Sequence, residues 1–528
     1  MFPLKFIQSE KSLIFMFDSM SQVKKPAFWA IAIAVSFFII NLAQIGRYGM
    51  SYDEPEGMER GRQTVALVAG TIWPASGKES EYRPGWIHNH PTFYATCNYG
   101  VCLALTKWFG CRPIPAGHFL NLLTASAGLV ALFHLGRLLF NTVVGLVAEV
   151  FMVFFPRFIA HAHFNGKDVP MMVFGTLALV LLIVADRRGQ VRYWILAGLG
   201  VAVAATTKLD GLFVLPIFLV PWLVKTLWSE HRLADLGKMG WFVGVSVVFI
   251  YALWPELWKD PLHLFHAVSN FAQDWRIKDA SYLGHTYRVD HLPWHYNTME
   301  FIAATPLILL ALVCVGMGWS LWCLFRRQNP FQHGLLWCWI LFPVLPRMLP
   351  GIIKYDGMRH IFLIVPAVAI MAGLGVEQLL ARWKGRVGYK LAPVVCCGAI
   401  VWSGWQILEC HPYEGFYLNE AVRAAIPGPK LGYYFDFYGW GTYYTQGVEW
   451  VNAHAPAHAT VSMGSDSSRL VFYGLREDLE PVPDMDKADY VLVGYWSEVN
   501  PDHFHDPPEL CLRCYGADLL RVYAADGQ

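Results

Sequence analysis

Charged side chains are scarce in this sequence of 528 residues. Asp, Glu, Lys and Arg together make up 15% of it, whereas a soluble domain carries about 25%. The formal net charge is only +1, so the chain lacks the basic excess that binds nucleic acid and implies no generic anionic surface as partner. Internal repeats and low-complexity stretches are also missing. Because 55% of the residues are hydrophobic, the composition excludes an ordinary soluble domain.

Paired cysteine motifs are lacking as well. The eleven cysteines are scattered, and many stand within apolar stretches, where a small buried hydrophobic side chain is the ordinary role. Only Cys511 and Cys514 have the spacing of metal ligands. A single CxxC without a second pair supports zinc weakly, so a local disulfide or free thiols are favoured.

The apolar residues gather in blocks of about 17 to 25, the length that spans the hydrocarbon core of a bilayer. Trp and Tyr crowd the block edges, as in interfacial belts. The first block, Ala27 to Ile45, follows Lys24 and Lys25 and lacks a small-residue cleavage site, so we interpret it as an uncleaved span. The pattern predicts a polytopic α-helical membrane protein. The other blocks cover residues 92–109, 117–140, 143–160, 169–185, 193–207, 211–228, 239–258, 299–325, 331–349, 360–381 and 389–409.

Four basic loops determine the predicted orientation, because cytoplasmic loops are rich in Lys and Arg. They are residues 186–192, 230–238, 325–328 and 381–390. All four loops lie on the cytoplasmic side only if one of the apolar blocks does not cross the membrane. We expect that block to be 92–109, which is short and is interrupted by polar residues and glycine. About eleven spans then remain, of which 193–207 is the shortest.

The sequence divides into three predicted parts. Residues 1–26 form a cytoplasmic N-terminus, and residues 27–409 form the transmembrane domain, with outer-face loops at 46–115 and 259–298. From residue 410 the apolar blocks give way to short alternating runs, "ATVSMGS", "RLVFYG", "DYVLVGYW" and "DLLRVYAA", separated by Pro, Gly and Asp. We therefore expect residues 410–528 to be a small α/β domain on the outer face.

With this topology, the polar residues that stand out all lie on the outer side. Ionisable groups near the membrane are costly and usually functional. Carboxylates and cations that converge at one interface suggest a site for an anionic, lipid-linked substrate. These residues are Asp53, Glu54, His88, His90, Lys167, Asp168, Asp290, His291, His295, Lys354, Arg359 and His360.

Each of these features also has a structural interpretation. Asp53 and Glu54 fit an ordinary solvated loop pair, and Asp168, before Val-Pro, fits a cap on the next span. Lys208 fits a lysine that snorkels at a span end. Trp294 belongs to "LPWHY", whose aromatics fit interfacial anchors. A metal site at His161 and His163 would need further ligands.

Several motifs, in this order, resemble a known superfamily. They are an Asp-Glu pair in the first outer loop, "HNHPTFY", "LGRLLF", "HFNGKDVPMMVFGTLAL", "TTKLDGLFVLP", "HLPWHYNTMEFIAATPL" and "RHIFLIVPAVAIMAGLG". Together they resemble the lipid-linked sugar transferases of the GT-C superfamily, particularly the protein O-mannosyltransferase (GT39) and aminoarabinose transferase group. The tail segments "HPYEGFYLNE" and "YFDFYGWGTYYTQGVEWVNAHAP" resemble the tail of bacterial members. The resemblance covers most of the chain.

The resemblance implies an activity. Such enzymes move a sugar, here a hexose or pentose, from a polyprenyl phosphate to an acceptor outside the cytoplasm, with inversion at the anomeric carbon. It also implies a multi-pass protein of a bacterial inner membrane whose site faces the periplasm. A protein, a glycolipid or a cell-wall glycan are all open as acceptors, and nucleic acid is not expected. A transporter and a lipid-glycan ligase or polymerase remain as alternatives.

The resemblance assigns the role of general base to Asp53, and its neighbours suggest the other roles. Glu54 beside it, together with the bilayer, is expected to raise the pKa of Asp53. Asp168 is expected to orient a substrate or hold a cation. The expected phosphate ligands are His90, Lys208, Arg359 and, in reserve, Lys167. The expected substrate-loop residues are His88, His291, Trp294 and His295.

No metal is required by these residues. A divalent cation held by Glu54, His88 and His90 remains an alternative.

Overall fold

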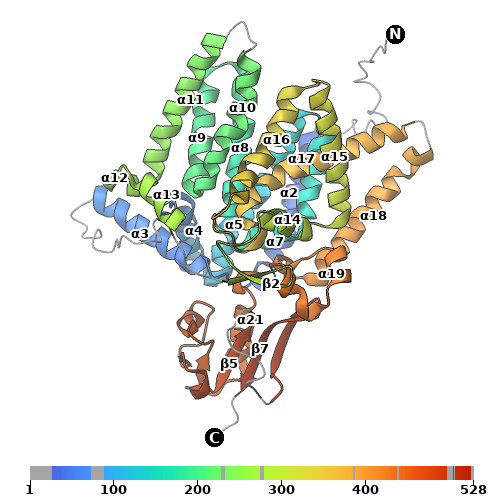
Figure 1. The fold of residues 1–528 in the computed structure, drawn as a ribbon. Coiled ribbons are helices and arrows are strands. Elements are labelled where there is room, and N and C mark those ends of the chain that lie inside the picture. Colours follow the sequence, from blue (N-terminus) through green and yellow to red (C-terminus); the bar gives the residue numbers. More distant parts are fainter. Residues whose placement is uncertain are drawn as a thin grey trace.

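The computed structural model describes residues 26–72, 89–227, 232–273, 279–384, 387–436, 439–495, 504 and 506–524. A large helical body stands above a smaller unit that contains a β-sheet, as Figure 1 shows. The helices of the body are α2 (Pro26–Ala43), α3 (Glu54–Ile72), α4 (Phe93–Phe109), α5 (Pro113–Leu139), α6 (Thr142–Val153), α7 (Pro156–Phe164), α8 (Asp168–Arg188), α9 (Val191–Thr207), α10 (Val214–Leu227), α11 (Arg232–Leu253), α12 (Glu256–Lys259), α13 (His263–Gln273), α14 (Tyr296–Ala303), α15 (Leu307–Phe325), α16 (Pro330–Val344), α17 (Val365–Trp383) and α18 (Val387–Cys410).

Every apolar block of the sequence contains a helix. Seven helices of the described residues are long and apolar enough to cross a membrane, or eight if one bent pair counts as a single span. Helix α9 and residues 394–410 are shorter apolar helices. Helix α4 does not belong to either group, and its place outside the membrane stays a prediction. The total of eleven crossings stays a prediction.

The block at 143–160 differs from the expected single span. It forms α6 and α7, which are bent by 69° to each other. Pro156 begins α7 and lacks the backbone N–H that a continuous helix needs, and the preceding Phe155 is extended, with φ −95° and ψ 103°. Every residue of α7 is buried. The bend therefore carries the polar turn that follows α7 into the interior.

Glycines let the central helices of the body approach closely. A Cβ on Gly316 of α15 would lie 1.7 Å from the carbonyl oxygen of Met371 in α17, and one on Gly375 would lie 2.1 Å from the carbonyl oxygen of Leu312. Small residues at such crossings are typical of helices packed in membranes. This contact holds α17 and the turn before it, η7 (Gly357–Ile364), in the centre of the body.

A small hairpin connects the outer loop of the body to the C-terminal unit. Strands β1 (Asp279–Tyr282) and β2 (His285–Arg288) pair antiparallel within the predicted outer loop 259–298. Their turn donates backbone hydrogen bonds to α20 (Leu431–Tyr434). The two parts are thus joined by secondary structure as well as by the chain itself.

The C-terminal unit contains a five-stranded sheet in the order β4-β3-β5-β7-β6. Strand β3 is parallel to β4 and β5, while β7 is antiparallel to β5 and β6. Helix α21 (Tyr444–His454) contacts β5 and β7. The strands are β3 (Thr460–Ser462), β4 (Glu480–Pro481), β5 (Tyr490–Gly494), β6 (Leu510–Cys514) and β7 (Ala517–Ala524).

One of the four alternating runs is not a strand. The first residues of "RLVFYG" belong to a 3-10 helix, η11 (Ser467–Val471). The hydroxyl of Ser467 accepts a hydrogen bond from the backbone N–H of Met463 and donates to the carbonyl of Gly464, which curls the chain.

Cys511 and Cys514 lie on β6, and both thiols are free.

Candidate functional site

Arg359, on the η7 turn, stands at the centre of a cluster of charges. Its Nη2 lies 2.6 Å from Oδ2 of Asp53, and its Nε lies 3.0 Å from Oδ2 of Asp168. Its third nitrogen, Nη1, lies 2.7 Å from Oδ2 of Asp356. The guanidinium also stacks on Trp440, at 4.3 Å from the ring centroid. One cation therefore joins two carboxylates that are 115 positions apart in the sequence.

Asp168 is the first residue of α8, and its side chain is fully buried. Its Oδ1 lies 2.5 Å from Nζ of Lys208, and Asn165 donates a hydrogen bond of 2.9 Å to its Oδ2. Lys208 also pairs with Asp210, at 2.9 Å. Asp168 is thus more than a helix cap, and Lys208 is ion-paired rather than snorkelling.

Asp53 lies just before α3, and its side chain remains 30% exposed. Besides Arg359 it contacts Lys167, whose Nζ lies 3.1 Å from Oδ2. Burial acts to raise the pKa of Asp53, but the charges of Arg359 and Lys167 outweigh burial and hold it well below the usual value. The expected raised pKa of Asp53 is therefore wrong for this state. The sequence-based expectation did not include the two cations, Arg359 and Lys167, that tertiary folding brings to this carboxylate.

Lys167 titrates in an accessible range. Burial, opposed by the charge of Asp53, lowers its pKa to about 8, and the positive charges of Arg60 and Arg359 act in the same direction as burial. His90 lies among the same groups. Burial and the nearby cations Lys167 and Arg60 hold the pKa of His90 well below its usual value, so this imidazole is neutral.

Glu54 does not share the environment of its neighbour Asp53. Its Oε2 accepts a hydrogen bond of 2.6 Å from the backbone N–H of Ser51, as the glutamate of a helix capping box does. Its Oε1 lies 2.8 Å from Nε2 of the buried His118. Successive residues at a helix start point in different directions, so the acidic pair divides between two surroundings rather than acting as one dyad.

The predicted substrate-loop residues lie elsewhere. The ring of His291 is 69% exposed and pairs with Asp290 at 2.7 Å. Trp294 is 61% exposed, and His295 contacts the hydroxyl of Tyr282 at 2.8 Å. Within the described part of the chain, these three side chains form no hydrogen bond or ion pair with the Arg359 cluster, and His88 lies outside that part.

Besides Asp356 and Asp210, two further residues at the cluster escaped the sequence analysis. Arg60 of α3 is 1% exposed, and among the described residues its Nε and Nη2 have no hydrogen-bond partner. Trp440 has φ 55°, in the left-handed region, between two glycines that also have positive φ. The signal for Trp440 was the Gly-Trp-Gly triplet, because flanking glycines permit such a turn. Arg60 gave no signal, since it resembles any surface arginine of an amphipathic helix.

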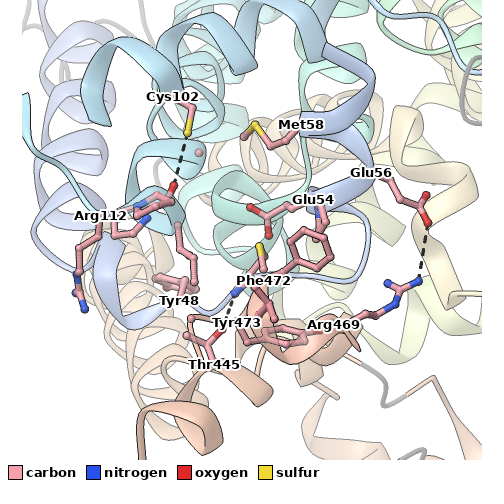
Figure 2. A pocket seen from close by; sticks show the side chains of 18 of the residues that line it. Tyr48, Glu54, Glu56, Met58, Cys102, Arg112, Thr445, Arg469, Phe472 and Tyr473 are labelled. Carbon is pink, nitrogen blue, oxygen red and sulfur yellow. Dashed lines mark hydrogen bonds and ion pairs between the residues drawn. The ribbon is translucent and has the colours of Figure 1, made fainter. Parts of the chain in front are cut away.

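Two cavities adjoin this cluster. The smaller, of about 30 Å³, is lined by Asp53, Arg60 and Lys167 together with Asn165 and Trp440. The larger, of about 980 Å³, lies between α3, the start of α5 and the C-terminal unit; Figure 2 shows side chains that line it. Glu54 and Met58 line both cavities. The larger cavity, on the side of the C-terminal unit, is therefore next to the small cavity of the charged cluster.

Within the described ranges, no three His, Cys, Asp or Glu side chains are arranged to hold a metal ion. His161 and His163 are turned apart: one contacts Asn165 at 2.9 Å, and the other contacts the carbonyl oxygen of Ile159 at 2.8 Å. The alternative metal set of Glu54, His88 and His90 includes a residue outside those ranges. Glu54 itself is engaged by Ser51 and His118.

Comparisons with known proteins agree on a superfamily. The family model described as dolichyl-phosphate-mannose-protein mannosyltransferase matches residues 104–258. The structure is similar to ArnT from Cupriavidus metallidurans bound to undecaprenyl phosphate, with 15% identity, 94% of this chain and 97% of that chain covered, and a TM-score of 0.51. No curated protein sequence gives a significant match.

A second group of similar structures is archaeal. The Archaeoglobus fulgidus oligosaccharyltransferase in the apo form has 11% identity and a TM-score of 0.52, with 89% of this chain and 69% of that chain covered. At this level of identity the likeness shows the fold. The chain is thus a helical membrane protein with the fold of these transferases. The family match and the fold together confirm its resemblance to the lipid-linked glycosyltransferases of the GT-C superfamily.

Proposed function

We propose that this chain is an inverting glycosyltransferase that moves a sugar from a polyprenyl-phosphate donor to an acceptor hydroxyl. The observation that carries the proposal is the cavity at Asp53, where a carboxylate and the cations Arg60, Lys167 and Arg359 are held together beside apolar helices. Charge-assisted hydrogen bonds from such cations are the usual means of holding a phosphate. Two similar structures support a lipid-linked donor, since one is bound to undecaprenyl phosphate and the other is in complex with a dolichol phosphate.

The burial of the two aspartates suggests how a phosphate enters. Asp168 is fully buried, whereas the side chain of Asp53 is 30% exposed. A phosphate that arrives at the cavity therefore takes the place of Asp53 on Arg359 and Lys167, while Asp168 continues to fix Arg359 and Lys208. A guanidinium offers a fork of donors that fits phosphate oxygens as well as carboxylate oxygens.

This exchange also prepares the base. Once the phosphate binds Arg359 and Lys167, the charges that lower the pKa of Asp53 are compensated, while burial, which raises it, remains. Asp53 can then accept the acceptor's proton as attack begins. The resemblance assigns this role to the first Asp of the pair.

The bonds balance without a further acid. The acceptor oxygen forms a bond to the anomeric carbon, the bond from that carbon to the phosphate oxygen breaks, and its electron pair leaves with polyprenyl phosphate. The acceptor's proton passes to Asp53. Because the leaving phosphate is stabilised by the cations, it needs no protonation, in contrast to the leaving group of a glycoside hydrolase. A single displacement inverts the anomeric centre. A divalent cation remains an alternative means of charge neutralisation.

We further propose that the site faces the outer side of a bacterial inner membrane and that the C-terminal unit lies on that side. The placement of the four basic loops supports this orientation. We also propose that the chain belongs to the GT39 group and that the transferred sugar is a hexose or a pentose.

A transporter is the competing class. Transporters place substrate sites between repeated halves at discontinuous helices near the midplane. Here the ionisable cluster adjoins a large cavity that the C-terminal unit helps to form. A lipid-glycan ligase or polymerase shares the chemistry and differs mainly in the donor.

The test is sugar transfer by the purified protein in sealed proteoliposomes with a radiolabelled polyprenyl-phosphate sugar. We expect transfer by the wild type and its loss in Asp53→Asn, with binding of polyprenyl phosphate retained. Asp484→Asn, which changes an exposed aspartate paired with Lys487, serves as the control. Movement of the donor across the bilayer without transfer, or full transfer by Asp53→Asn, would disprove the proposal.

A further inference from the structure

The larger cavity is formed jointly by the helical body and the C-terminal unit. From the body come α3, α4 and the start of α5; from the C-terminal unit come α21 and the segment 468–474. Figure 2 shows Met58 and Glu54 entering it from the body and Phe472 and Tyr473 from the opposite wall. Its volume of about 980 Å³ is at the upper end for sites that enclose a small molecule.

This cavity reaches the charged cluster through two side chains. Glu54 and Met58 line both the larger cavity and the small one that holds Asp53. Asp53 itself lines only the small cavity. A molecule in the larger cavity therefore approaches Asp53 past Glu54 and Met58, from a side separate from Arg359 and Lys208.

The walls of the larger cavity are mostly apolar. Tyr48, Met50 and Tyr473 are buried side chains that line it, and Phe472, which is 54% exposed, stands at its edge. When a ligand binds against such a surface, few polar groups lose their hydrogen bonds to water. The surface therefore favours an apolar ligand. The polar side chains of the lining, among them Thr445, Asn452 and Ser468, can bind the hydroxyl-bearing end of such a ligand.

The lining holds three arginines and four glutamates, and each arginine pairs with a glutamate. Arg62 pairs with Glu59 at 2.7 Å, Arg112 with Glu449 at 3.6 Å, and Arg469 with Glu56 at 3.9 Å. The carboxylate of Glu54 is held by His118 and Ser51. With each cation matched to a carboxylate, the cavity does not select a strongly charged ligand.

The cavity also borders the helix that the sequence places at the membrane surface. Residues Tyr99 and Cys102 of α4 line it, and further along α4 the side chains of Trp108 and Phe109 are 80% and 73% exposed. Exposed aromatic residues at the end of such a helix are typical of the membrane interface. Helix α4 therefore runs from the cavity lining to an aromatic end of the kind found at the membrane surface.

Arg469 connects this cavity to the base. It donates a hydrogen bond of 3.2 Å to the carbonyl oxygen of Tyr52, and its guanidinium lies 5.3 Å from the centroid of the Tyr52 ring. Tyr52 directly precedes Asp53 in the chain. The wall contributed by the C-terminal unit is therefore attached to the residue next to the proposed base.

We propose that this cavity is the acceptor site and that the acceptor is an uncharged amphiphile, with an apolar body in the cavity and a free hydroxyl directed past Glu54 toward Asp53. The chemical class is a glycolipid or a related lipid-borne alcohol. The inference rests on the proposed function for the reaction, but the binding of an amphiphile in this cavity stands independently of it.

The experiment uses the full chain in nanodiscs and a dodecyl glucoside with a photoreactive diazirine in its alkyl chain. Adducts are mapped by mass spectrometry. The variant Ser468→Trp places an indole in the cavity from an exposed wall position, and Ser465→Trp adds the same group at an exposed position of the same segment outside the cavity. We expect adducts on the cavity walls of the wild type and of Ser465→Trp, and a decrease of about tenfold in Ser468→Trp, because the space is filled.

The same preparations test the proposed function and the acceptor site separately. Binding of undecaprenyl phosphate tests the donor site, and we expect it to be equal in all three proteins; its absence in the wild type would count against the proposed function alone. With donor present, sugar should be transferred to dodecyl glucoside, and the KM for this acceptor should rise in Ser468→Trp. Adducts that avoid the cavity walls, transfer that Ser468→Trp leaves unchanged, or transfer to a serine-containing peptide but not to the glucoside would each overturn the acceptor inference.

Discussion

Asp53 and Asp168 bind the same guanidinium from two sides. Oδ2 of Asp53 lies 2.6 Å from Nη2 of Arg359, and Oδ2 of Asp168 lies 3.0 Å from its Nε. They differ in access, since the side chain of Asp53 is 30% exposed and that of Asp168 is not exposed at all. The inner carboxylate therefore holds the cation in place, and the outer one can exchange with a ligand. Four predictions concern this arrangement and the helices that support it.

Arg359→Lys should abolish most of the activity although it keeps the charge. A lysine has a single ammonium group and cannot contact Asp53, Asp168 and a phosphate with separate nitrogens in a fixed plane. We expect kcat/KM for sugar transfer to fall by about 10²–10³-fold, the usual effect of removing a preorganised donor. Arg423→Lys is the control, because Arg423 pairs with Glu409 at 2.7 Å, away from the cluster. Equal activity of the two variants would contradict the role of Arg359.

Arg60→Met should weaken donor binding without lowering stability. Arg60 is 1% exposed, and two of its nitrogens have no partner among the described residues, so its burial costs free energy that an apolar side chain of similar size does not. We expect the Kd for undecaprenyl phosphate to rise by about 10- to 100-fold, the worth of one charge-assisted hydrogen bond. The Tm should stay equal or rise.

Arg62→Met, two positions away, is the matched variant for this binding experiment. Arg62 is 40% exposed and pairs with Glu59, so its replacement should leave the Kd for undecaprenyl phosphate unchanged. A fall in Tm in Arg60→Met with unchanged donor affinity would show that Arg60 serves packing alone.

Donor binding should weaken as the pH rises through about 8. Burial lowers the pKa of Lys167 to about 8, so below this pH the ammonium is charged and attracts the phosphate, and above it the charge is lost. The Kd for undecaprenyl phosphate, measured between pH 6.5 and 9.5, should therefore increase in the wild type. The Kd increases with pH, and does not decrease, because the charged form of Lys167 is the form that binds the phosphate.

Lys167→Arg separates this titration from others. A guanidinium keeps its charge throughout that range, so the inflection should disappear, while titration of the phosphate or of another residue would leave it in place. An inflection at the same pH in both proteins would rule out Lys167 as its source.

Gly316→Ala should destabilise the helical body, whereas Gly318→Ala should not. A Cβ at position 316 would lie 1.7 Å from the carbonyl oxygen of Met371, while one at 318 meets nothing within 4 Å. The forced separation of α15 and α17 should cost about 1–3 kcal/mol. Thermal unfolding followed by circular dichroism in detergent measures the difference. Equal Tm values would mean that these helices can separate freely.

Much of this molecule follows from sequence pattern. Every apolar block forms a helix because hydrogen bonds within a helix satisfy the backbone of an apolar segment. The break at Pro156 was missed because the apolar run continues through it and only the proline marks the bend. "RLVFYG" was misassigned because a short apolar run looks alike in a strand and in a 3-10 turn.

For the site, the sequence indicated chemically relevant residues but not which of them lie together in the folded protein. Asp53, Lys167, Asp168, Lys208 and Arg359 form one network of ion pairs, whereas His291, Trp294 and His295, selected on the same grounds, lie in another environment. Spacing along the chain contains no information on which loops meet when helices pack in three dimensions. Adjacent residues also separated, since Glu54 turned to His118 while Asp53 turned to Arg359.

The sequence by itself determined the class of the protein and the positions of its helices, because hydrophobicity and helix formation depend on residues close along the chain. Only the tertiary structure decided the charge state of the site. The pKa of Asp53 is low and that of Lys167 is near 8 because burial and charges from distant segments act on each group together. Tertiary packing also created the larger cavity, since its two walls come from parts of the chain about 400 residues apart.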